Sequence, residues 1–289
     1  MNKNMFQPVQ PNNKKLPFGC RLQVDKTKQI ILPHWHDTYE IDYVIQSSNQ
    51  NFYLDGKTFD QSTNEIVCVN PYQIHGLNLP NDENRVAITL MIPLLFLDNL
   101  NINKLDLQIQ NRIIDSKNEH YLLLKSLFRE LYSILTVPED VLSRTEEIGL
   151  VSAILGILFR YFSKKTAFVL NNYSSKRIRY IRDILEWLNS NYMNDVSIAE
   201  MAQRISLSES YFSHVFKQTV GQSPLNYLSS LRAVHAQQII QNEDRTMTEI
   251  ASMVGFSNVK SMNETFKKDL GITPYQYKIQ QKKAGFDIF

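Results

Sequence analysis

The C-terminal region of the chain repeats itself with a period of about fifty residues. The repeated features are an alanine-containing tripeptide, a Phe-Lys pair and a Gly-Pro-Tyr set. They pair as Glu200–Ala202 with Glu249–Ala251, Phe216–Lys217 with Phe266–Lys267, and Gly221, Pro224 and Tyr227 with Gly271, Pro274 and Tyr277. A repeat of this length is one supersecondary unit, so the region is expected to fold as two copies of the same small unit.

Each copy is expected to consist of two short helices joined by a tight turn. Ser197 and Ser208 are the capping residues of the first copy, and Thr246 or Thr248 caps the first helix of the second copy. The four helices are predicted over 198–204, 209–218, 249–253 and 258–268. A short helix, a turn and a second helix make the helix-turn-helix arrangement, in which the second helix enters the major groove of DNA.

The stretch between the two copies reads as one long helix. Residues 224–241 contain no glycine or proline after Pro224, and Gly221 and Gly271 stand where helices are expected to end. A rigid connection of this kind would let the two copies address successive major-groove segments about 34 Å apart. One such pattern alone is equally compatible with an ordinary helical bundle, but two matching copies argue against that alternative.

Five stretches of this region carry a family resemblance. They are Ser208–Lys217 (SESYFSHVFK), Gly221–Tyr227 (GQSPLNY), Leu231-Arg232 with Ala236, Thr248–Ser257 (TEIASMVGFS) and Phe266–Pro274 (FKKDLGITP). Through them, residues 178–280 resemble the DNA-binding domain of the AraC/XylS family of bacterial transcription regulators. The resemblance implies a regulator that binds double-stranded DNA in a sequence-specific way. It implies no enzyme activity and no cofactor, and it makes RNA polymerase a further partner.

The resemblance also assigns DNA contacts. The family's base-contacting positions map onto Ser210, Ser213, His214, Val259, Lys260 and Asn263. Asparagine can bind adenine through two hydrogen bonds and lysine can donate to guanine, so the second recognition helix is expected to supply more of the specificity than the serines of the first. Contacts to phosphates, which position the protein without specifying sequence, are expected from Ser208, Lys217, Lys267 and Lys268. The alternative for each lysine and for His214 is an ordinary solvated surface position.

Residues 18–93 are expected to form strands. Short apolar runs alternate with turn-forming clusters at spacings of about ten residues, which is typical of a β-sandwich or a barrel. Asp55-Gly56 lies between two such runs and predicts a tight hairpin.

A histidine-rich motif lies in this region. His34, His36 and Glu40 would share one face of a strand, and His75 would come from another strand. Such a set could hold a metal ion, or it could contact a polar ligand or serve as hydrogen-bonded structural histidines. The spacing resembles that of cupins, and AraC/XylS regulators commonly carry a cupin-like ligand-binding domain. We therefore expect a small-molecule effector here, with no metal. The predicted contacts are His34, Trp35, His36, Tyr39, Glu40 and His75.

The identity of the effector is predicted from the aromatic side chains near this motif. Rings such as Trp35 and Tyr39 could stack on the face of a sugar, so a carbohydrate is the expected effector, although barrel core is an equal alternative for these rings. Two other readings remain: a metal-dependent cupin enzyme fused to a DNA-binding domain, and a ligand-independent regulator whose barrel only dimerises.

The segment 94–165 is expected to be helical. Apolar residues recur there at intervals of three and four and form a seam: Ile148, Val151, Leu155, Leu158 and Phe162. The seam either packs on the barrel or forms the interface of a homodimer, and we predict that it contributes to homodimerisation.

The predicted fold class is α+β. The domains are a flexible arm over 1–17, a cupin-like double-stranded β-helix barrel over 18–93, a helical dimerisation segment over 94–165, a linker over 166–176 and a tandem helix-turn-helix domain over 177–283. The chain's net charge is only +2, but residues 174–289 hold 14 basic and 11 acidic side chains, so the basic excess lies in the DNA-binding region. Two cysteines and the lack of a signal or membrane-spanning segment predict a cytoplasmic protein.

Overall fold

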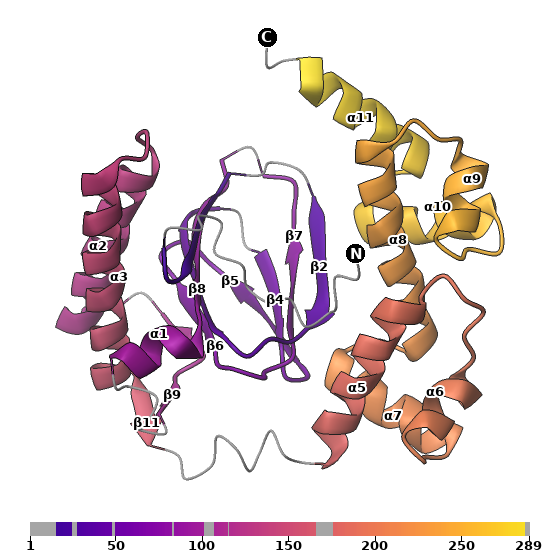
Figure 1. Ribbon diagram of the computed structural model, residues 1–289, viewed down its shortest axis with the longest axis horizontal. Helices are drawn as coiled ribbons and strands as arrows, with labels where there is room; N and C mark the ends of the chain where they lie inside the picture. Colours follow the sequence, from indigo (N-terminus) through magenta and orange to yellow (C-terminus); the bar gives the residue numbers. More distant parts are fainter. Residues whose placement is uncertain are drawn as a thin grey trace.

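The computed structural model describes residues 16–24, 28–47, 50–82, 84–100, 107–114, 116–165 and 176–286. Nearly all of the predicted arm, 1–15, and of the predicted linker, 166–175, lies outside the described residues. A β-barrel occupies the middle of the molecule, with a pair of helices on one side and an all-α domain on the other (Figure 1).

The barrel consists of two facing antiparallel sheets. Its strands are β1 (Gly19–Gln23), β2 (Gln29–His34), β3 (Tyr39–Gln46), β4 (Gln50–Leu54), β5 (Lys57–Gln61), β6 (Ile66–Val69), β7 (His75–Leu79), β8 (Val86–Ile92) and β10 (Arg112–Ile113). One sheet has the order β1-β8-β3-β6-β10 and the other β2-β7-β4-β5. The predicted hairpin is confirmed, because Asp55 and Gly56 join β4 to β5 with φ angles of 44° and 88°.

Side chains of strand β3 alternate between the outer face of its sheet and the barrel interior. Tyr39 and Tyr43 point to the outer face, where Tyr43 stacks on Phe128 with ring centroids 4.5 Å apart. Glu40 and Asp42 alternate with these tyrosines and therefore point into the barrel. The prediction that Tyr39 contacts an effector beside Glu40 is wrong for this reason: its ring packs on Phe159 and its hydroxyl donates to the Leu107 carbonyl.

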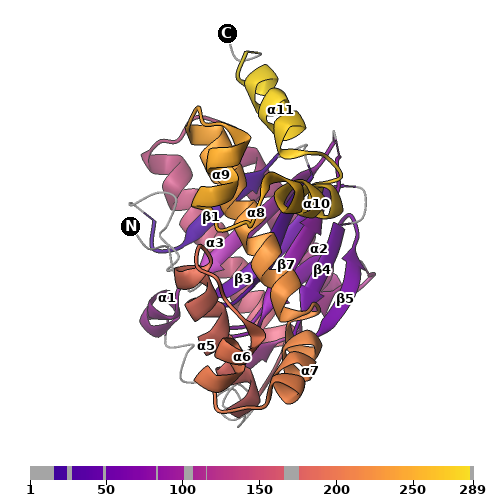
Figure 2. The same cartoon turned by 90° about the vertical axis from the view of Figure 1, so that its right-hand side faces the viewer.

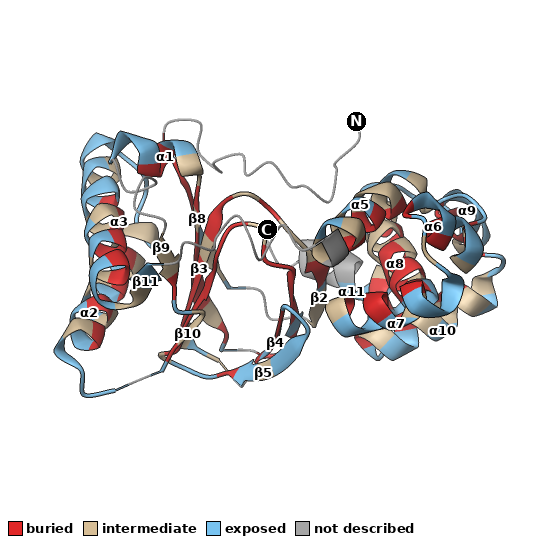
Figure 3. Ribbon diagram, turned by 90° about the horizontal axis from the view of Figure 1, so that it is seen from below, coloured by how far each residue is buried: buried red, intermediate tan, exposed pale blue. Residues whose placement is uncertain are grey.

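Two helices cover this outer face. They are α2 (Glu119–Leu135) and α3 (Val141–Tyr161). The rest of the segment that was predicted to be helical, 94–165, contains α1 (Leu94–Asn99), β9 (Leu107–Ile109), β10 and β11 (Ser163–Lys165), and β11 pairs with β9. The apolar seam of α3 faces the sheet: Val151, Leu155 and Leu158 are fully buried in the chain's own core (Figure 3). The seam is therefore core, and these three residues are not available to a second chain. Phe162 packs at the edge of this core, whereas Ile148 is partly exposed.

The C-terminal domain is built of helices alone among the described residues. They are α5 (Lys176–Asn191), α6 (Ile198–Arg204), α7 (Glu209–Val220), α8 (Pro224–Asn242), α9 (Met247–Met253), α10 (Val259–Leu270) and α11 (Pro274–Phe286). Helix α8 runs between the two helix-turn-helix units, α6–α7 and α9–α10, as Figure 2 shows. The α+β fold class is confirmed, with a β-sandwich domain followed by an all-α domain.

The capping pattern of this domain follows the sequence closely. Ser197 and Thr246 cap α6 and α9, and Thr246 forms a capping box with Glu249. Gly221 and Gly271 end α7 and α10 in the left-handed conformation, with φ of 81° and 80°. The predicted caps and the long connecting helix are therefore confirmed by the structure.

Candidate DNA-binding surface and effector site

The first recognition helix, α7, has one buried and one open face. Phe212, Val215 and Phe216 are buried in the core of the unit, so the other side of the helix is open to solvent. Ser210, His214 and Lys217 are exposed and Ser213 is half-buried. The Ser208 side chain accepts a hydrogen bond from the Tyr211 amide, which fixes the start of the helix.

The second recognition helix, α10, repeats this arrangement. Met262 and Phe266 are fully buried. Asn258 caps the helix by accepting from the Ser261 amide at 2.9 Å. Of its predicted contact residues, Lys260, Lys267 and Lys268 are exposed and Asn263 is half-buried, whereas Val259 packs against the core of the unit. Apart from Val259, the predicted base and phosphate contacts thus have exposed or half-buried side chains on the two recognition helices or, for Ser208, at the start of α7.

Arg232 connects helix α8 to the first unit, a role that was not predicted from the sequence. Its guanidinium donates to the carbonyl oxygens of Tyr192 and Asn194, at 2.7 and 2.8 Å. These oxygens belong to the segment between α5 and α6, so the bonds hold α8 against the first unit. Arginine suits this place because its fork of N–H groups can satisfy two acceptors at once.

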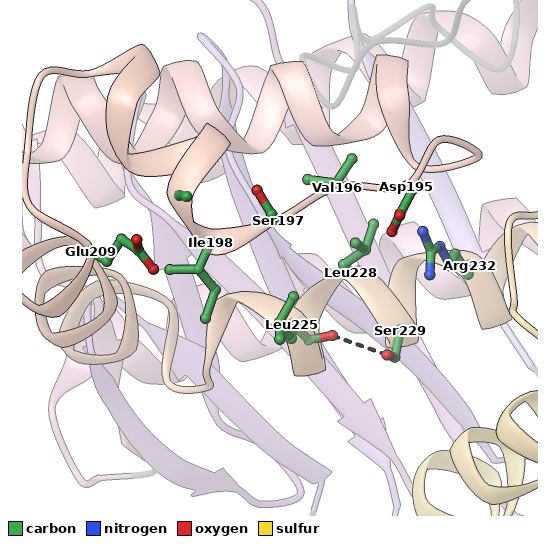
Figure 4. A pocket seen from close by; sticks show the side chains of 10 residues that line it. Asp195, Val196, Ser197, Ile198, Glu209, Leu225, Leu228, Ser229 and Arg232 are labelled. Carbon is green, nitrogen blue, oxygen red and sulfur yellow. Dashed lines mark hydrogen bonds between the residues drawn. The ribbon is translucent and has the colours of Figure 1, made fainter.

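Each unit also carries a shallow groove at the corresponding place. In the first unit a groove of about 550 Å³ lies between the start of α6 and α8, with Ser197 and Leu225 among its lining (Figure 4). In the second unit a groove of about 480 Å³ includes the corresponding residues Thr246 and Tyr275. No residue predicted to contact DNA lines either of these two grooves in the described part of the chain.

Inside the barrel, His34, His36, Glu40 and His75 come together. One ligand atom from each lies within 4.8 Å of the others. Glu40 Oε2 is 2.9 Å from His36 Nε2 and 3.2 Å from His75 Nε2. His36 and His75 are almost completely buried. The expectation that His34, His36 and Glu40 share one face of a single strand is wrong. The chain turns after His34, so the cluster is assembled from β2, β3, β7 and the turn that carries His36.

The far side of each imidazole ring is held by the backbone. Nδ1 of His34, His36 and His75 lies 2.9, 3.1 and 3.0 Å from the carbonyl oxygens of Leu32, Thr38 and Gln73. A carbonyl oxygen can only accept, so Nδ1 carries the proton and Nε2 is directed to the cluster. This orientation is typical of histidines that bind metal ions, and a set of three imidazoles and one carboxylate suits Zn²⁺ or a similar ion.

Burial and the neighbouring charges shift the pKa values of the cluster side chains in different directions. Burial alone would raise the pKa of Glu40, but the charges and hydrogen bonds of His75 and His36 outweigh it and hold the pKa well below its usual value. Burial would lower the pKa of His75, but Glu40 raises it by more. Burial, with repulsion from His75 and His36, lowers the pKa of His34 to about 3. The cluster therefore combines a charged carboxylate with a neutral His34.

A second group of buried polar side chains, not predicted from the sequence, continues from the cluster along the barrel interior. Asp42 Oδ1 accepts from the Thr89 hydroxyl, and Gln23 donates to Thr89 at 2.6 Å. Arg85, only 2% exposed, donates to Gln23 and Gln50. Oδ2 of Asp42 has no hydrogen-bond partner among the described residues. The alternation Glu40-x-Asp42 along β3 was the available signal for this group.

The side chain of Trp35 lies on the outside of the barrel. Its ring packs against the C-terminal domain, 5.0 Å from the guanidinium carbon of Arg182 on α5. The prediction that Trp35 contacts an effector inside the barrel is therefore wrong, because its ring packs in the core of the C-terminal domain.

Comparison with known proteins agrees with both halves of this fold. The AraC-like ligand binding domain matches residues 19–150, and a helix-turn-helix domain matches residues 201–280. The chain is 24% identical over 251 residues to the HTH-type transcriptional regulator YdiP of Escherichia coli, covering 87% of this chain and 82% of that one.

Two further relatives are regulators of named operons. The melibiose operon regulatory protein of Escherichia coli is 24% identical over 292 residues, covering 92% of this chain and 91% of that one. The Msm operon regulatory protein of Streptococcus mutans is 22% identical over 152 residues, covering 53% of this chain and 55% of that one. None of the described helices is long and apolar enough to cross a membrane. With an AraC-like ligand binding domain matched in one half and a helix-turn-helix domain in the other, the chain belongs to the AraC family of transcription regulators.

Proposed function

We propose that this DNA-binding regulator responds to a small polyhydroxylated effector, a carbohydrate, that binds inside the barrel. The observation that carries the proposal is the buried polar interior, above all the carboxylate of Asp42, whose Oδ2 has no hydrogen-bond partner among the described residues. A buried carboxylate oxygen without a donor is costly, and a ligand hydroxyl would supply that donor. Glu40, Thr89 and Arg85 add acceptors and donors nearby.

The relatives support the same class of effector. One of them is named as the regulator of a melibiose operon. Melibiose is therefore the first compound to test, with maltose as a disaccharide of equal size for the control. The proposal is about chemical class, so a panel of monosaccharides completes the screen.

Thermal unfolding of the full chain tests this directly. A ligand that binds only the folded state, at one hundred times its Kd, adds about 2.7 kcal/mol to the free energy of unfolding. We expect one member of the sugar panel to raise Tm by several degrees and Asp42→Asn to lose that shift. If no sugar shifts Tm in the wild-type chain, the carbohydrate proposal is wrong.

A divalent metal ion is a second candidate ligand for the histidine cluster. The observation that favours it is the bond from each Nδ1 to a carbonyl oxygen, which directs three Nε2 atoms toward one carboxylate. Titration with Co²⁺ gives the test, since bound Co²⁺ produces visible absorption bands that depend on its ligands. Bands that vanish in His75→Gln would support a metal, and a colourless protein would contradict it.

We propose that sequence is read mainly by α10 and that the lysines anchor the protein to phosphates. The support is that Lys260 and Asn263 stand on the open side of α10, where the corresponding side of α7 carries Ser210 and Ser213. Longer side chains with directional hydrogen-bonding groups discriminate bases better than short hydroxyls.

Homodimerisation stays a prediction, and of the seam only Ile148 offers exposed surface for it. Sedimentation of the full chain tests it: a dimer mass is expected, and a monomer at micromolar concentration would contradict it.

A further inference from the structure

The histidine cluster lies directly behind the surface on which the DNA-binding domain packs. Each cluster histidine is next in the sequence to a residue that packs against the C-terminal domain. His34 and His36 flank Trp35, and His75 follows Ile74. Trp35 and Ile74 both pack in the same apolar core as helices α5, α7 and α8. The wall of the cluster is therefore also the wall of the domain interface.

Arg182 of α5 lies on this wall. Its guanidinium carbon is 5.0 Å from the centre of the Trp35 ring and 5.5 Å from that of Tyr72. The Tyr72 ring is positioned by a left-handed backbone, φ 68°, and by its amide, which donates to the His36 carbonyl at 2.7 Å. A movement of His36 would thus reach both rings that hold Arg182.

The first helix-turn-helix unit is attached to the same wall by two hydroxyls. Tyr227 of α8 donates to the carbonyl oxygen of Pro33, the residue before His34, at 3.1 Å. Tyr53 of β4 donates to the carbonyl oxygen of Thr219, near the end of the recognition helix α7. Both hydrogen bonds join a residue of the barrel to a residue of the C-terminal domain. They therefore exist only while the barrel and the first unit are docked.

From these contacts we infer that the state of the histidine cluster is transmitted to the first helix-turn-helix unit through Trp35 and Tyr72, with Arg182 as the coupling residue. The inference rests on the proposed function in so far as a ligand sets the state of the cluster. A ligand can shift the arrangement only if it binds docked and undocked forms unequally, and a cluster in the interface wall meets that condition. Arg182 touches neither DNA nor effector in this scheme, so it is a positioning residue.

A double-mutant cycle on the full chain tests the coupling without any ligand. Glu40→Gln alters the cluster, and Arg182→Gln removes the cation that its wall holds. The matched control is Arg204→Gln, because Arg204 stacks on Trp187 at the same distance, 5.0 Å, within the C-terminal domain. DNA affinity is measured by fluorescence anisotropy on a duplex selected from a random library with the wild-type chain.

We expect Glu40→Gln to change DNA affinity at least about fivefold in the wild-type and Arg204→Gln backgrounds, and less than about twofold in the Arg182→Gln background. An equal change in all three backgrounds, or no change in any, would overturn the inference. Circular dichroism melts verify that each variant is folded. If Glu40→Gln is not folded, His75→Gln takes its place under the same criteria.

A spectroscopic readout separates coupling from a merely structural role. In a Trp187→Phe chain, Trp35 is the only tryptophan, since the sequence has two. We expect the Glu40→Gln substitution to shift the fluorescence emission of Trp35 when Arg182 is present, and to cause no shift in a chain that also carries Arg182→Gln. Identical emission shifts in the two chains would count against the coupling. Thermal shifts with melibiose on the same proteins distinguish the two hypotheses. A coupled cycle without any sugar shift supports the coupling and contradicts only the carbohydrate proposal.

Discussion

The two helix-turn-helix units are nearly identical in local structure and different in what they touch. Gly221 and Gly271 end their recognition helices with the same left-handed geometry. A Cβ atom built at Gly221 would lie 2.8 Å from the Tyr53 ring of the barrel, whereas at Gly271 no described atom comes within 4 Å. Tyr227 donates to the barrel at Pro33, but its counterpart Tyr277 accepts from Gln241 of α8.

The cores of the two units differ in the same direction. The first unit shares one apolar cluster with Leu32, Tyr53 and Ile74 of the barrel. The core of the second unit meets the barrel at Ile30. The two units therefore differ in their surroundings: the first unit is held by the ligand-binding domain, and the second carries the longer side chains, Lys260 and Asn263, that we propose read the bases.

The largest expected effect is on the free energy of unfolding, and it distinguishes the cores of the two units by what each core supports. Phe216→Ala and Phe266→Ala each empty a fully buried site and are expected to cost about 3–5 kcal/mol of unfolding free energy. Hydrogen exchange should show that Phe216→Ala also loosens the β4–β5 hairpin, because its cluster includes Tyr53. Phe266→Ala should leave the hairpin protected. Equal loosening by both would mean that the units are equally attached.

The next effect concerns base reading. Asn263→Ala should relax the preference at one operator position by about 1–3 kcal/mol, the value of a good two-bond base contact. Ser213→Ala, its counterpart in the first unit, should change the preference much less. Binding to an operator library gives both values. The division of labour fails if Ser213→Ala relaxes a position and Asn263→Ala lowers affinity for every sequence alike.

A smaller effect should be common to both units. Lys217→Ala and Lys267→Ala each remove an exposed cation at the same repeat position. If each lysine neutralises one phosphate, the slope of log affinity against log salt should fall by about 0.9 in each variant, with base preference unchanged. Titrations at several salt concentrations measure the slope. A slope that changes for only one lysine would show that the units approach DNA differently.

How much the sequence predicts depends on how local the cause is. Ser197, Ser208 and the two capping glycines act within one or two turns of chain, so their roles were predicted correctly. The cluster of His34, His36, Glu40 and His75 was identified by spacing, although the strand geometry behind it was wrong.

Other features have no local signal. The apolar seam of α3 predicts a buried face but not which surface covers it, and the structure shows the barrel in that place. The hydrogen bond from Tyr53 to Thr219 joins residues 166 positions apart, and no sequence pattern near either residue predicts this contact. The partner of Arg182 was equally hidden, because Trp35 read as a residue of the barrel interior.

The most direct test of the asymmetry uses the two glycines as a matched pair. Gly221→Ala and Gly271→Ala incur the same backbone strain, about 1 kcal/mol for a side chain at positive φ. Only Gly221→Ala adds a collision with Tyr53 of the barrel. The measurement is hydrogen exchange of β4 and β5 in the full chain. We predict faster exchange there in Gly221→Ala and wild-type exchange in Gly271→Ala. The same response in both variants would contradict the account that the barrel holds the first unit through this contact.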